Sequence, residues 1–81
     1  MSNLRSLMYA ATIYTLNKKN GDCLERKAFN EVDEMFAYLN DKDAFNSSNP
    51  NKFEIIFNQD RAHFNSKMPW LSDNVSVDFV A

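Results

Sequence analysis

The six residues 17–22, Asn-Lys-Lys-Asn-Gly-Asp, separate two strand-like segments and decide how the fold begins. Residues 8–16 before them are rich in Tyr, Thr and Ile and contain no Gly, Pro or charged residue, which is the composition of a strand. Asn and Gly at 20–21 both tolerate the positive φ of a tight turn. The pattern therefore predicts a β-hairpin. A two-residue loop at 20–21 would place Tyr14 opposite Lys27, and a longer loop would shift that register.

A helix of about ten residues is predicted after the hairpin. Asn30 is placed to cap its first turn, and the acidic residues that follow favour the positive end of the helix dipole. Apolar residues then recur at i, i+3, i+4 and i+7, so they share one face of the helix: Val32, Met35, Phe36 and Leu39. The segment is thus predicted to be amphipathic.

Two further strands are predicted in the second half of the chain. Residues 52–58 alternate between apolar and mostly polar side chains, and a similar alternation starts at Val75 and runs to the end. Residues 59–68 are compatible with a short helix capped by Asp60 or with a strand of a second hairpin. The sequence does not decide between these two alternatives.

These elements predict a single α+β domain over residues 1–81, built as a two-layer sandwich. The expected sheet is antiparallel, with about four strands in the order strand, strand, helix, strand, strand, and one main amphipathic helix covers one face. Apolar residues on both faces of the hairpin exceed what one helix can cover. Either a second short helix or a partner subunit is expected to cover the rest, so a homodimer is one alternative.

The composition is that of a small globular protein. The 81 residues are 44% hydrophobic and 25% charged with a net charge of −2, which excludes a disordered or collagen-like chain. The single cysteine, Cys23, excludes an intramolecular disulfide and fits a reducing compartment, so a cytoplasmic location is expected. No apolar run approaches the ~20 residues of a membrane helix, and no membrane association is expected.

The sequence contains no recognisable catalytic or cofactor motif. Its one histidine, His63, and its one cysteine, Cys23, lie on different predicted elements, and the only glycine belongs to the hairpin turn rather than to a phosphate-binding loop. Multi-cysteine metal sites are excluded. We therefore predict a protein that is not an enzyme, with no catalytic residues, no cofactor and no metal site.

Two surfaces are candidates for macromolecular contacts. The first lies around Pro69, where an irregular segment combines Trp, Met and basic residues of the kind that anchor interfaces: Arg61, His63, Lys67, Met68 and Trp70. The second is a basic hairpin surface on which Tyr9 or Tyr14 would stack bases: Arg5, Lys18, Lys19, Arg26 and Lys27. Positive charge gathers in residues 1–30, whereas residues 31–60 are acidic.

The expected function is that of a small non-enzymatic protein-binding protein, an inhibitor or accessory protein that occupies the surface of a larger protein. Asn, Lys, Phe, Ile and Tyr, which AT-rich codons specify, supply 30 of the 81 residues. That bias is typical of phage accessory proteins, so the expected partner is a host or defence protein in the host cytoplasm. The alternative is an RNA-binding accessory protein that uses the basic hairpin.

Overall fold

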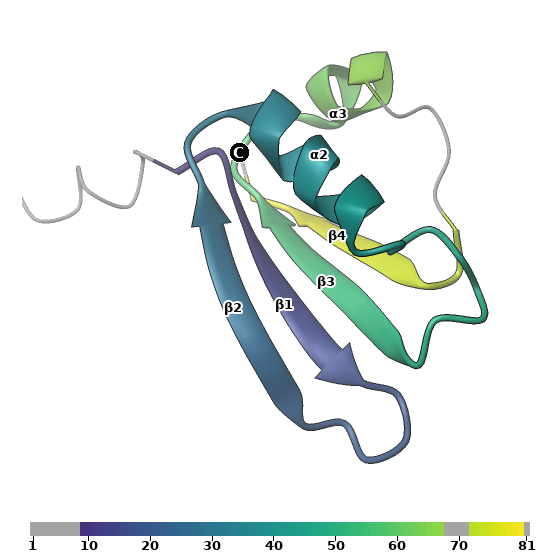
Figure 1. The fold of residues 1–81 in the computed structure, drawn as a ribbon. Coiled ribbons are helices and arrows are strands. Elements are labelled where there is room, and N and C mark those ends of the chain that lie inside the picture. Colours follow the sequence, from purple (N-terminus) through teal and green to yellow (C-terminus); the bar gives the residue numbers. More distant parts are fainter. Residues whose placement is uncertain (1–8, 68–71, 81) are drawn as a thin grey trace, which may run out of the picture.

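The computed structural model describes residues 9–67 and 72–80 (Figure 1). Within them the chain forms one sheet and two helices, in the order β1 (Ala11–Asn17), β2 (Cys23–Phe29), α2 (Val32–Asp41), β3 (Asn51–Phe57), α3 (Arg61–Lys67) and β4 (Val75–Phe79). Both helices pack on the same side of the sheet, because the Phe64 ring of α3 contacts Phe36 of α2 as well as Phe57 of β3. The predicted two-layer α+β class is confirmed.

The sheet is mixed, which corrects the predicted antiparallel arrangement. Its strand order is β2-β1-β3-β4, in which β1 runs antiparallel to both neighbours whereas β3 and β4 are parallel. The reason is that the segment 59–68, for which the sequence allows either a helix or a hairpin strand, contains the helix α3 at Arg61–Lys67. A helical connection returns the chain to the end of the sheet where β3 began, so the next strand must run parallel to β3.

The hairpin register also differs from the one predicted for a two-residue loop. Four residues, 18–21, form the turn: the Asn17 N–H donates to the Asp22 carbonyl at 2.8 Å, and the Gly21 N–H donates to the Asn17 carbonyl at 2.7 Å. A further shift occurs between Thr15 and Leu16. The longer turn and this bulge together place Tyr14 opposite Arg26 rather than opposite Lys27.

Gly21 is the residue of the turn that needs an unusual backbone conformation, with φ at +78°. A Cβ added there would meet nothing within 4 Å, so a substitution costs only conformational strain. Gly21→Ala is expected to lower the free energy of unfolding by about 1 kcal/mol, and Gly21→Asn by less, because Asn tolerates positive φ. Urea denaturation measures both values, and equal losses in the two variants would contradict this account.

The core lies between the sheet and the helices. The four apolar residues predicted to face it from α2 are all buried, as are Phe53, Ile55 and Phe57 of β3. The helix begins one residue later than predicted: Glu31, not Asn30, occupies the cap position, in an extended conformation and without a side-chain cap hydrogen bond. Within residues 9–67 and 72–80, neither helix has the length and apolarity needed to cross a membrane.

Candidate functional site

Both helices lie over one face of the sheet, and within residues 9–67 and 72–80 no other element covers the opposite face (Figure 1). Two rows of paired residues run across all four strands on that side, and none of them is buried. The first row joins Arg26, Tyr14, Glu54 and Ser76, and the second joins Ala28, Thr12, Ile56 and Asp78. We call these eight residues the open face.

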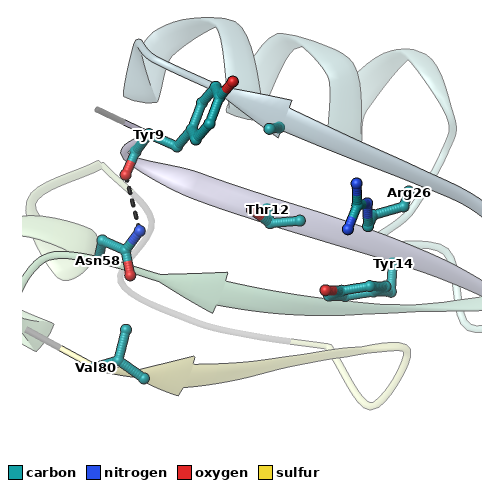
Figure 2. Close-up of a pocket in the computed structure, with 7 residues that line it drawn as sticks. Tyr9, Thr12, Tyr14, Arg26, Asn58 and Val80 are labelled. Atoms are coloured by element: carbon teal, nitrogen blue, oxygen red, sulfur yellow. Dashed lines mark hydrogen bonds between the residues drawn. The ribbon is translucent and has the colours of Figure 1, made fainter. Parts of the chain in front are cut away.

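The open face is hollowed at the end where β1 begins. The hollow has a volume of about 560 Å³, and its lining comes from all four strands or the residues that flank them: Tyr9, Thr12, Tyr14, Arg26, Ala28, Asn58 and Val80. Figure 2 shows the Tyr9 and Val80 side chains at one end and Arg26 with Tyr14 at the other. The Asn58 Nδ2 group donates to the Tyr9 carbonyl at 2.9 Å and so holds the residue before β1 against the end of β3.

The charges of the open face are of both signs. Glu54 lies 3.6 Å from the Lys52 ammonium of its own strand, with both side chains nearly half exposed. Arg26, which flanks Tyr14 on the other side, makes no ion pair with any residue that the structure describes. Its guanidinium is therefore available to an anionic group from outside the molecule.

The nucleic-acid candidates do not form one surface. Arg26 lies on the open face, whereas the Lys27 ammonium lies on the helix side, 5.9 Å from the ring centres of both Phe29 and Tyr38. Lys18 donates to the Ser47 carbonyl at 2.9 Å, and Lys19 is exposed at the hairpin tip. The fifth candidate, Arg5, lies outside the described residues.

Tyr38 of α2 is the centre of a polar cluster at the β2 side of the helix layer. Its hydroxyl donates to a Glu25 carboxylate oxygen, and the Lys42 ammonium lies 5.6 Å from its ring centre. Burial, followed by the hydrogen bond to Glu25, raises the pKa of Tyr38 above its ordinary value of 10.0. Within this cluster, Lys27 packs on the rings of Phe29 and Tyr38 at the edge of the sheet.

The raised pKa of Tyr38 predicts a pH dependence of stability. Folding retains the phenol proton, so the contribution of Tyr38 to stability is present below pH 10.0 and is lost as the pH rises through the folded-state pKa. The difference between alkaline absorbance titrations of the wild type and Tyr38→Phe should have a midpoint above 10.0. In urea, which unfolds the chain, the midpoint of the same difference should fall to the ordinary value of 10.0. A folded-state midpoint at or below 10.0 would contradict the prediction.

The predicted protein-contact residues are divided between described and undescribed parts of the chain. The Arg61 guanidinium stacks 4.5 Å from the centre of the Phe79 ring, and the exposed His63 ring lies 6.2 Å from that of Phe57. Lys67 is the last residue of α3, while Met68 and Trp70 lie outside the described residues. His63 also lines a smaller hollow of about 260 Å³ at the start of α2, together with Asn30, Glu31, Val32, Asp33 and Gln59.

In the part of the chain that the structure describes, no three His, Cys, Asp or Glu side chains are grouped closely enough to hold a metal ion. Cys23 is exposed at the start of β2, and His63 lies on α3. The structure thus gives these two residues no shared site, and the hollow of the open face contains neither.

Sequence reasoning did not identify four residues that line the hollow, namely Thr12, Ala28, Asn58 and Val80. Thr12 could have been predicted from the alternation of side chains along the first strand, because Thr12 and Tyr14 must lie on one face of the sheet. Asn58 and Val80, however, follow different strands and meet only because β3 and β4 are parallel neighbours.

Neither a protein-family model, nor a curated protein, nor a solved structure matches this chain.

Proposed function

We propose that this chain is a small non-enzymatic binding protein that occupies the surface of a larger protein through its open face. One observation carries the proposal: no helix or strand that the structure describes covers one hollowed face of the four-stranded sheet, and this face presents Tyr14 beside Arg26, which forms no ion pair with another described residue. Tyr and Arg are enriched at the energetically dominant centres of protein interfaces, where they combine a large contact area with directional hydrogen bonds.

The charge of the open face favours a protein partner over a nucleic acid. Arg26 and Lys52 are positive on this face, whereas Glu54 and Asp78 are negative, so a phosphate backbone crossing the strands would meet charges of both signs. A protein surface can present both signs at matching positions. The exposed Tyr9 and Val80 add apolar contact area at the rim of the hollow.

The residue composition extends the proposal to a setting. The abundance of residues specified by AT-rich codons supports a phage origin, and the partner would then be a host or defence protein in the host cytoplasm. A protein that inhibits another by occupying its surface needs contact area and charge complementarity rather than a catalytic group, and the residues that line the open face can supply both.

The test is affinity capture of the tagged protein from host lysate, with and without ribonuclease. A stoichiometric protein partner that survives ribonuclease is expected, and capture should be lost in the double variant Tyr14→Ala, Arg26→Ala. The matched control is Arg61→Ala, His63→Ala, which changes the contact surface predicted from the sequence and leaves the open face intact. Loss of capture only in the control pair would move the contact to α3 and overturn the proposal.

RNA binding is the second candidate function, and one observation favours it: Tyr14 and Arg26 are paired on an uncovered four-stranded sheet, an arrangement suited to stacking a base. If RNA binds there, Arg26→Ala should weaken the binding of a fluorescent oligouridine more than Lys27→Ala, because Lys27 lies on the helix side. The affinity should also fall steeply with salt. Binding that is absent or independent of salt would exclude this function.

A further inference from the structure

We propose that the hollow of the open face takes an extended segment of the partner protein that places one carboxylate at Arg26 and an apolar side chain between Tyr9 and Val80. This inference rests on the proposed function and specifies the chemistry of the partner. It is drawn from the two ends of the hollow, which differ in character, and from the spacing between them.

The Arg26 end recognises an anion. Arg26 is exposed, makes no ion pair among the described residues and lies next to the Tyr14 ring in the sheet register. Glu54, the acidic neighbour on the other side of Tyr14, already lies beside Lys52 at 3.6 Å. A carboxylate from a partner can therefore accept two parallel hydrogen bonds from the Arg26 guanidinium without displacing an internal partner.

The opposite end recognises an apolar group. Tyr9 and Val80 are among the few large hydrophobic side chains that the described structure leaves exposed, at 44% and 51%. Figure 2 shows them at the same end of the hollow, on opposite sides of Asn58. The hydrogen bond from Asn58 to the Tyr9 carbonyl fixes the backbone of this wall. An inserted apolar side chain would cover part of both exposed surfaces.

The spacing of the two ends specifies an extended segment. Glu54 shares the row of Arg26, and Asn58, at the apolar end, is four residues further along the chain, just beyond the end of β3. At about 3.3 Å per residue this is roughly 13 Å along the strands, and Arg26 lies on β2, two strands away from β3, or roughly 10 Å across the sheet. An extended partner therefore crosses the strands obliquely, with its side chains i and i+4 pointing to the same side roughly 13 Å apart. The side chain at i+2 would lie over Thr12, in the middle of the hollow.

A second copy of this chain fits the hollow less well. A two-fold dimer through this face would set one hollow against an identical hollow, and a symmetric interface requires a surface that complements itself. A narrow segment, by contrast, fills a concave site.

The experiment is an NMR titration of the ¹⁵N-labelled full chain with the acetylated, amidated pentapeptide Glu-Ser-Thr-Ser-Phe. Two control peptides replace its Glu by Lys or its Phe by Ser. We expect amide shift changes at Thr12, Tyr14 and Ala28, with binding about fivefold weaker for each control peptide. Arg26→Gln should abolish the preference for Glu over Lys. Lys19→Gln, which removes the same charge at the hairpin tip, should keep that preference.

Equal binding of the Glu and Lys peptides, or shift changes confined to other surfaces, would overturn the inference. Shifts of open-face amides that depend on protein concentration alone would also overturn it, because they would show that a second copy occupies the face. If affinity capture depends on Tyr14 and Arg26 while no peptide binds the hollow, the inference fails and the proposed function stands. If peptides bind but capture does not depend on these residues, the proposed function fails.

Discussion

Phe64→Ala is expected to lower the free energy of unfolding by about 3–5 kcal/mol, the largest loss that we predict for a single substitution. Phe64 is 1% exposed and is the one buried side chain among residues 61–66 of α3. Its ring centre lies 5.4 Å from that of Phe36, 5.3 Å from that of Phe57 and 5.7 Å from that of Phe79. The substitution leaves a cavity at the point where both helices and two strands meet.

The loss should be measured by urea denaturation followed by circular dichroism. Small domains have total stabilities of about 5–15 kcal/mol, so Phe64→Ala can leave little folded protein. Phe64→Leu keeps most of the apolar volume and provides a second, milder variant, with an expected loss of about 1–2 kcal/mol. His63→Ala is the matched control, because His63 is the neighbouring residue of α3 but is exposed; its expected cost is about 0.5 kcal/mol. A loss below 1 kcal/mol for Phe64→Ala would contradict the assigned core.

The elements that the sequence predicted well are those defined by local periodicity. The apolar spacing of α2 placed its buried face correctly, and the apolar residues of the alternation predicted over 52–58 include Phe53, Ile55 and Phe57, which share one face of β3 and are buried. Both patterns require only that neighbouring side chains share one environment. They are therefore visible without knowledge of which other element supplies that environment.

The direction of β4 could not be predicted in the same way. It depends on whether residues 59–68 form a helix or a strand, and this short segment has only Phe64 as a buried apolar residue among its first six helical positions. The helix is supported by Asp60, whose carboxylate accepts the His63 N–H at 2.8 Å. A helix capped by Asp60 was one of the two structures that the sequence allowed for this segment, the other being a strand. The contacts of Phe64 with rings far away in the chain favour the helix.

The candidate site depends on the hairpin register, which a local pattern does not specify. A shift of one residue along a strand exchanges the two faces of the sheet, so the four-residue turn and the bulge decide that Arg26, not Lys27, accompanies Tyr14. The hollow also needs Asn58 and Val80, which follow two strands that are far apart in the chain and adjacent in the sheet. Sequence alone placed Arg26 and Tyr14 on one hairpin surface but set Lys27, not Arg26, opposite Tyr14.

Asn74→Ala is expected to lower the free energy of unfolding by about 2–3 kcal/mol, the second large loss. Asn74 immediately precedes β4 and is 2% exposed. Its side-chain Nδ2 group donates to the carbonyl of Ala44 at 2.9 Å and to that of Asn51 at 2.8 Å. One amide thus joins the start of β4 to the loop after α2 and to the start of β3. Alanine would leave both carbonyls without this donor, that of Ala44 in a buried position and that of Asn51 in a partly buried one.

Asn49→Ala provides a chemically matched comparison for Asn74→Ala. The Asn49 Nδ2 group also donates to two carbonyls, those of Lys42 at 2.9 Å and Asp43 at 3.0 Å, both at the exposed surface of the same loop. Its Oδ1 accepts a third bond, from the Asn51 N–H at 2.9 Å, so Asn49 makes more side-chain hydrogen bonds than Asn74 donates. Water can replace that donor, so the expected loss is below about 1 kcal/mol. Urea denaturation of the two variants separates burial from the number of hydrogen bonds. Equal losses would show that burial of the Asn74 amide does not stabilise the position of β4.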